Sequence, residues 1–139
     1  MTVSESIINW LMEFDQEEYW KMKKIDTDMQ GAKVDEYSLA REPIQNVKAY
    51  ISGKKIYTDH YTFQARLANT TDADRIDNNG FGEALEGWVR EKDMRGEFPV
   101  LEGGKVRSID ITTPFYAGRA SDNSFVYQMT IAIKYEKER

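Results

Sequence analysis

The stretch Tyr57–Leu67, YTDHYTFQARL, decides the fold of this chain because two kinds of side chain alternate along it. One set of positions holds Tyr57, Asp59, Tyr61, Phe63, Ala65 and Leu67, and the other holds Thr58, His60, Thr62, Gln64 and Arg66. Side chains two residues apart lie on the same face of a β-strand. The stretch therefore predicts a long strand with one mostly apolar face.

The residues before this strand predict its partner. Val47–Ile51 is followed by Ser52-Gly53, and a glycine in such a turn favours a β-hairpin whose second strand starts at Lys55. A short edge strand is expected further upstream, because Pro43 has no N–H to donate and is tolerated at sheet edges. Its apolar residues are Tyr37, Leu39 and Ile44.

Two segments have the apolar spacing of helices. The first begins near Val3, where Thr2 and Glu5 have the spacing of a capping box. Its apolar stripe comprises Ile7, Ile8, Leu11 and Phe14. The second helix is expected over residues 72–94, with Thr71 or Asp72 as its N-cap. Its core-facing stripe comprises Phe81, Leu85, Trp88 and Val89.

A second hairpin is predicted in the last third of the chain. Val106–Thr112 alternates as a strand, and residues 125–135 alternate as clearly as the first long strand. Between them we expect a polar excursion over Pro114–Ser124, and a frayed tail from Glu136 to Arg139. The order helix, hairpin, helix, hairpin predicts an α+β fold. We expect an antiparallel sheet of about four strands with both helices on one face.

Length and composition limit the classes of protein that this chain fits. A length of 139 residues predicts a single domain over residues 1–139. No cysteine is present, which favours synthesis in a reducing compartment and excludes disulfides and thiol chemistry. We expect neither a signal peptide nor a membrane helix. The net charge of −5 disfavours tight binding to nucleic acid, because that affinity comes from lysine and arginine.

Residues 72–83, DADRIDNNGFGE, have the acidic ends of an EF-hand calcium loop. Asp72, Asp74 and Glu83 occupy the first, third and twelfth places, where such a loop needs ligands. Ile76 at the fifth place offers no oxygen, and the sixth place holds aspartate instead of glycine. The stretch therefore favours a helix start, where the helix dipole stabilises acidic side chains. A small ligand- or calcium-binding regulatory module is the alternative reading.

The sequence offers little support for an enzyme. His60 is the only histidine, and it lies on the more polar face of the predicted strand, beside Thr58 and Thr62. An acid–base pair of His60 with a carboxylate is conceivable, but no serine elbow, second histidine or cysteine accompanies it. The glycines match neither a dinucleotide fingerprint nor a P-loop. We therefore expect no catalytic residue, no cofactor and no metal.

The whole chain resembles a family of phage proteins. The segments that carry the likeness are MTVSESIINWL, IDTD, NVKAYISGKKIYTDHYTFQARL, DADRIDNNGFGEALEGWV and SFVYQMTIAIKYEKE. In order and texture they resemble small minor capsid or tail-completion proteins of siphoviruses and prophages of Gram-positive bacteria. That family is similar to phage tail terminators. The likeness runs nearly end to end but contains no catalytic motif.

This resemblance implies a structural role in the virion. It implies a helix-flanked antiparallel sheet, a hexameric ring on the tail tube and a face that docks to the head connector. DNA would only pass through the lumen, and the protein would be made in the host cytoplasm and end in the tail or neck. Strand edges would join neighbouring copies head to tail, a contact that closes into a ring.

Two segments are our candidates for contacts between copies. One is the hairpin turn Ser52, Gly53, Lys54 and Lys55, and the other is the excursion Pro114–Ser124. Within or beside them, the specific candidates are Tyr57, Tyr116 and Arg119. We expect that removing Pro114–Ser124 leaves the fold intact and weakens ring formation.

Overall fold

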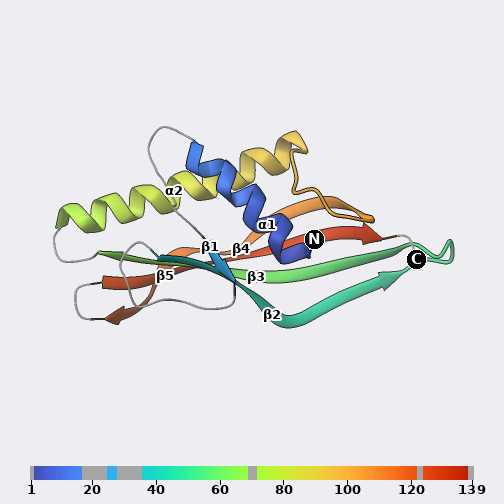
Figure 1. The fold of residues 1–139 in the computed structure, drawn as a ribbon, viewed down its shortest axis with the longest axis horizontal. Coiled ribbons are helices and arrows are strands. Elements are labelled where there is room, and N and C mark those ends of the chain that lie inside the picture. Colours follow the sequence, from blue (N-terminus) through green and yellow to red (C-terminus); the bar gives the residue numbers. More distant parts are fainter. Residues whose placement is uncertain (1, 17–24, 28–35, 69–71, 122–123, 138–139) are drawn as a thin grey trace.

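The computed structural model describes residues 2–16, 25–27, 36–68, 72–121 and 124–137. Its elements are α1 (Val3–Leu11), the 3-10 helix η1 (Met12–Gln16), β1 (Ile25–Thr27), β2 (Glu36–Ala49), β3 (Lys55–Ala68), α2 (Asp72–Arg95), β4 (Gly104–Ser121) and β5 (Ser124–Lys137). The strands form one sheet in the order β1-β2-β3-β5-β4, and both α-helices cover the same face of it (Figure 1). The predicted α+β fold with its four antiparallel strands is confirmed.

Strands β2 and β3 are longer and more continuous than the sequence suggested. They pair in antiparallel register from Glu36–Arg66 to Ala49–Lys55, with an irregularity between Arg41 and Gln45. Pro43 lies in this irregularity, so its missing N–H interrupts no regular ladder position. The expected separate short edge strand around Pro43, with Tyr37, Leu39 and Ile44, is therefore wrong in extent: these residues belong to β2, which continues into the hairpin.

The predicted excursion between the last two strands is also wrong. Strand β4 continues through Pro114 to Ser121 and pairs with β5 as far as the partners Ser121 and Ser124. Register shifts interrupt this pairing at four places along β4. Removing Pro114–Ser124 would thus delete part of the sheet, and the expectation that the fold survives that deletion is withdrawn.

The helices match the prediction closely. Thr2 is the N-cap of α1, and its hydroxyl accepts a hydrogen bond from the Glu5 amide at 3.1 Å. Helix α2 begins at Asp72 and ends at Arg95, one residue beyond the predicted end. Asp72, one of the two predicted N-caps, is the first residue inside α2. The other candidate cap, Thr71, and the last two residues of the tail, 138–139, lie outside the described residues. Glu136 and Lys137 belong to β5 and were wrongly expected to fray.

An aromatic core fills the space between the helices and the sheet. The rings of Trp10 and Trp88 lie 4.7 Å apart, which joins α1 to α2. Phe14 and Phe81 meet edge to face at 6.0 Å, and Phe81 also contacts Tyr37 of β2. Offset and edge-to-face pairs of this kind add to the free energy gained from burial. The core therefore ties both helices to the middle of the sheet.

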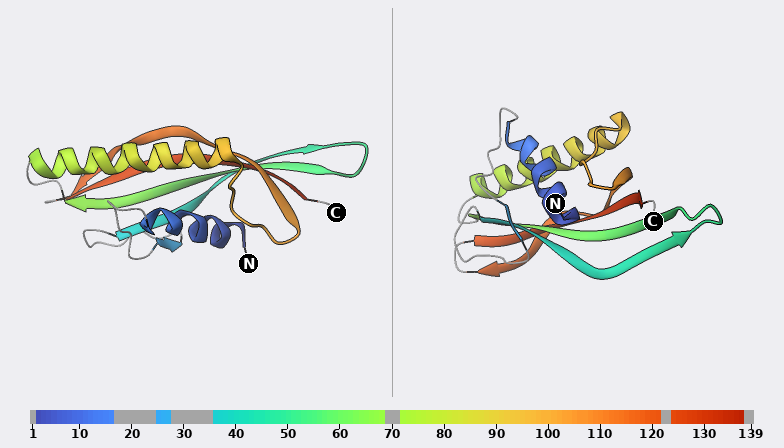
Figure 2. Two further views of the ribbon diagram at one scale, coloured as in Figure 1. Left: turned by 90° about the horizontal axis from the view of Figure 1, so that it is seen from above. Right: turned by 45° about the vertical axis from the view of Figure 1, so that its right-hand side comes forward.

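Two further features complete the described fold. The three-residue strand β1 pairs in parallel with β2 at Tyr37–Leu39, which the sequence did not predict. Among the described residues, no helix has the length and apolar character needed to span a membrane. Seen from above, the hairpin of β2 and β3 extends past both helices (Figure 2).

Candidate functional site

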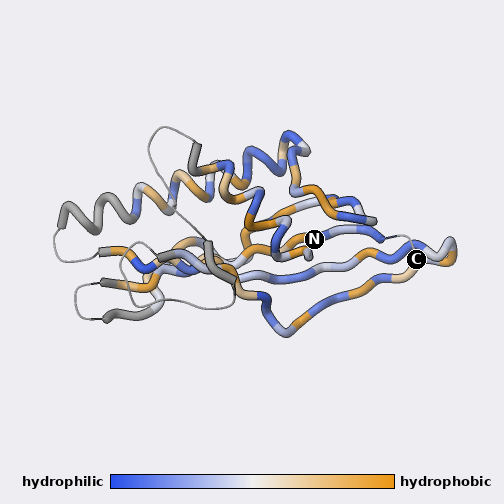
Figure 3. The backbone as a smooth tube through the Cα atoms, viewed as in Figure 1, coloured by the Kyte–Doolittle hydropathy of each residue, from blue (hydrophilic) through white to orange (hydrophobic). Residues whose placement is uncertain are grey.

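The part of the β2–β3 hairpin that extends past the helices is the candidate site. We define it as residues 43–58 and call it the arm. Large apolar side chains are exposed along it: Ile44, Val47, Tyr50 and Ile51. Ile51, at the tip, is fully exposed. Figure 3 shows orange segments along the outer strand of the arm and at its tip.

The tip of the arm is a tight turn that glycine makes possible. Gly53 has a φ angle of +90°, a region that residues with a Cβ seldom adopt. The Gly53 amide donates to the Tyr50 carbonyl at 3.0 Å, and the Tyr50 amide donates to the Lys54 carbonyl at 2.9 Å. These bonds fix the loop, so Ile51 is held outward by an ordered backbone.

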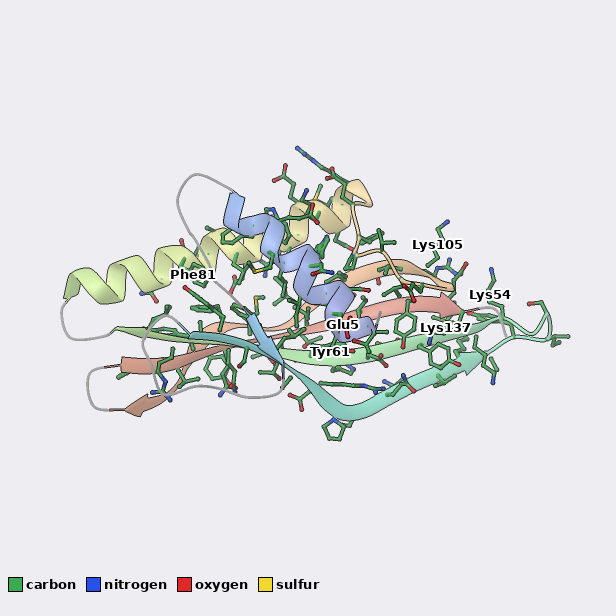
Figure 4. The ribbon with its side chains drawn as sticks, viewed as in Figure 1. Glu5, Lys54, Tyr61, Phe81, Lys105 and Lys137 are labelled. Carbon is green, nitrogen blue, oxygen red and sulfur yellow. The ribbon has the colours of Figure 1, made fainter. Side chains whose placement is uncertain are left out.

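The four predicted turn residues lie together at this tip. Ser52 and Lys55 are exposed, whereas Gly53 and Lys54 are half-buried. The Lys54 ammonium lies 3.6 Å from a carboxylate oxygen of Glu136 in β5. An exposed pair of this kind contributes little to stability. Figure 4 shows Lys54 beside Lys137 at the arm side of the sheet.

A buried carboxylate holds the base of the arm. The side chain of Asp59 in β3 is 2% exposed. Its two oxygens accept hydrogen bonds from the Tyr135 hydroxyl at 2.8 Å and from the Gln45 side-chain amide at 2.5 Å. The Arg41 guanidinium lies 3.8 Å away, at the edge of ion-pair distance. Asp59 of β3 thus connects β5, through Tyr135, to β2 on both sides of the irregularity at Pro43, through Arg41 and Gln45.

Within this cluster the Tyr135 hydroxyl is the hydrogen-bond donor and the Asp59 carboxylate is the acceptor. Burial, and then the hydrogen bond to Asp59, raise the pKa of Tyr135 well above its ordinary value. The phenol therefore stays protonated and remains a donor through the whole neutral range. Thr62 also donates to Glu42 across the irregularity. An open cleft of about 580 Å³ lies above the cluster, between the start of α1 and the sheet.

Tyr57, a predicted contact residue, lies on the same face as this cluster. Its ring stacks on Tyr135 at 5.4 Å, and the Lys137 ammonium lies 5.8 Å from both rings. Tyr57 is half-buried, so it supports the arm more than it presents a free surface.

Tyr116 and Arg119 lie elsewhere. Tyr116 is exposed and pairs in register with Gln128, toward the opposite end of the sheet from the arm. Its hydroxyl lies 3.4 Å from the Gln128 side-chain oxygen. Arg119 of β4 pairs in register with Val126 of β5, and the Arg119 side chain lies outside the described part of the structure. The structure therefore does not bring the two predicted segments together within one copy.

The residues of the calcium-loop and histidine alternatives lie in α2 and β3. Residues 72–83 all lie in α2, so Asp72, Asp74 and Glu83 belong to a helix and not to an EF-hand loop. The predicted helix start is confirmed. His60 is half-buried in β3 and pairs in register with Ala132, on the face of the sheet away from the helices.

Two features of the site were missed by reasoning from sequence. One is the burial of Asp59, although an acidic residue in the apolar register of a strand was a usable signal. The other is the exposure of Ile44 and Val47, which read as ordinary strand residues. Comparison with known proteins adds no constraint: no protein-family model and no curated protein matches this chain.

Proposed function

We propose that this chain is a structural virion protein, a phage tail terminator or head–tail joining minor capsid protein. In this proposal, copies form a hexameric ring at the end of the tail tube and stop tube polymerisation. The other side of the ring docks to the head connector, and DNA only passes through the lumen. The phage assignment draws on the sequence resemblance, whereas the assembly role draws on the geometry of the arm.

The observation that carries the assembly role is the arm itself. Its apolar side chains lie beyond the helix layer, so the protomer's own core does not cover them. An ordered, protruding patch of large apolar residues favours contact with another protein. The arm is held rigidly by the Asp59 cluster, which limits the entropy lost on binding.

The edges of the sheet support the same role. Beyond its pairing with β1, β2 bonds only to β3, and β4 bonds only to β5 among the described strands. Such edges offer unpaired backbone groups, and head-to-tail contact between two different edges closes into a ring when the rotation fits. The net charge of −5 suits a lumen that DNA crosses without binding.

The proposal is tested by sedimentation velocity over a wide concentration range, together with negative-stain microscopy of the protein alone and mixed with short tail tubes. We expect closed rings and rings capping tube ends, with tubes that no longer elongate. Tubes incubated with buffer control for spontaneous arrest. A particle that remains a monomer at every concentration and leaves tube growth unchanged would refute the proposal.

A further inference from the structure

A shallow groove lies between α1 and the segment that follows α2. Its volume is about 250 Å³. The lining residues are Ser6, Asn9, Trp10, Glu13, Phe98, Pro99 and Val100. The floor is mainly apolar, and the Val100 side chain at its rim is 84% exposed. An exposed valine beside an apolar hollow is suited to being covered by another apolar group.

The groove is preformed. The Trp10 indole donates to the Glu97 carbonyl at 2.8 Å, which ties the floor to the segment on the other side. The Ser6 hydroxyl is buried and has no hydrogen-bond partner among the described residues. A polar group in this state is usually satisfied by a ligand, water or partner.

The charge of Glu13, which lines the groove, is opposite to the charge of the arm. Residues 2–14 carry Glu5 and Glu13 and no lysine or arginine. Lys92, near Glu13, is already paired with Glu97 at 2.9 Å, and that hydrogen bond raises the pKa of Lys92. The arm contains the three lysines 48, 54 and 55 and no acidic residue, although the whole chain has a net charge of −5. Opposite charge of this kind orients partners and speeds their association.

We propose that the arm of one copy docks in this groove of a second copy, with Ile51 against the apolar floor. The inference rests on the proposed function, because it names the surface that receives the arm in the ring. An apolar cavity of about 150 Å³ accommodates a benzene-sized molecule, so the groove has room for the Ile51 side chain. The lysines of the arm then face the acidic side of α1.

The contact must form between copies. Only the base of the arm lies near the start of α1, whereas its tip extends past both helices, away from the segment that follows α2 (Figures 1 and 2). The arm and the groove are different surfaces, so each copy donates one and accepts one. Such a contact is heterologous and propagates head to tail until it closes.

The absence of cysteine from the chain makes a direct test possible. One preparation carries Ile51→Cys and another carries Val100→Cys, and the two are mixed under mild oxidation. We expect a disulfide-linked heterodimer as the main product, since the docked geometry brings the two positions together. The double variant Ile51→Cys/Val100→Cys should give a covalent ladder that stops at the ring size. A matched control mixes Ile51→Cys with Glu83→Cys, an exposed position on α2 outside the groove.

A charge exchange provides a second readout. Lys55→Glu and Glu13→Lys should each slow cross-linking severalfold, and combining the two on opposite copies should restore it. Ile51→Ser should weaken self-association about tenfold, because an apolar side chain no longer leaves water.

The outcomes separate this inference from the proposed function. Cross-linking of Ile51→Cys to Val100→Cys no faster than to the Glu83→Cys control overturns the docking, even if rings still form. Disulfide formation between two Ile51→Cys copies in preference to the mixed pair also overturns it, because it indicates a two-fold contact. Rings that form normally with Ile51→Ser lead to the same conclusion, while the proposed function stands.

Discussion

The two halves of the β2–β3 hairpin share their strands but not their surroundings. In the half under the helices, Leu39 and Phe63 are completely buried. In the arm, Val47 is 50% exposed although it lies on the same face of the sheet, as its register with Tyr57 shows. The pattern of apolar residues therefore continues past the point where the molecule's own helices end.

The strands of this hairpin are therefore longer than the core requires. Fourteen residues at about 3.3 Å each reach roughly 45 Å, which is more than α1 and α2 cover. The Asp59 cluster marks the boundary between the halves, because its buried hydrogen bonds fix the direction of the uncovered part. One half of the hairpin belongs to the core of the protomer, and the apolar side chains of the other half are exposed.

Truncating side chains at matched positions of β2 tests the difference between its two halves most directly. Leu39→Ala should lower the free energy of unfolding by about 2–5 kcal/mol, because it leaves a cavity in the core. Val47→Ala should change it by no more than about 0.5 kcal/mol, since the side chain has little to pack against. Urea denaturation at a concentration where the protein is monomeric measures both. A loss for Val47→Ala close to that for Leu39→Ala would mean that the arm packs on its own core.

A smaller effect is expected at the boundary. Tyr135→Phe should reduce stability by about 1–3 kcal/mol at pH 7, because the buried Asp59 carboxylate loses a donor. Tyr116→Phe, whose hydroxyl is exposed, is the matched control and should change little. Both are measured by urea denaturation.

The pH dependence of this effect has a definite sign. Because the pKa of Tyr135 is raised on folding, its contribution is complete below about pH 10, the ordinary tyrosine value, and falls as the pH rises above it. The stability gap between wild type and Tyr135→Phe should therefore narrow above pH 10. A stability difference that stays constant up to pH 11 would show that folding does not raise the pKa of Tyr135.

The sequence predicted what local periodicity controls. The alternation of β3 and β5 and the stripe of α2 were found because each apolar set faces one core. The alternation does not specify whether a helix of the same chain or another molecule covers that face. The exposure of the apolar side chains of the arm was therefore not predicted. Asp59 was placed on the correct face, but its burial depends on Tyr135, 76 residues away in the chain.

The predicted strand Val106–Thr112 is shorter than β4 for a different reason. Pro114, Gly118 and neighbouring threonines and serines are turn signals in isolation. In an edge strand they are tolerated, since an edge proline needs no partner for its missing N–H and register shifts absorb irregular residues. Their cost therefore depends on position in the sheet, which local sequence does not specify.

The smallest predicted effect concerns two glycines of α2. It tests how tightly α2 packs against β4 near Phe115. A Cβ on Gly82 would lie 2.3 Å from the Phe115 ring, which itself stacks on Tyr127 at 5.2 Å. Gly87 has open space at the same position. Gly87→Ala should raise stability by about 0.5–1 kcal/mol, because alanine favours the helix.

Gly82→Ala has the same helical gain, but the overpacking should outweigh it and leave a net loss of about 1 kcal/mol. Thermal unfolding of the two variants side by side measures the difference, which should be opposite in sign. If Gly82→Ala also stabilised the protein, Phe115 would have to move freely. That result would mean that α2 packs only loosely against Phe115 of β4.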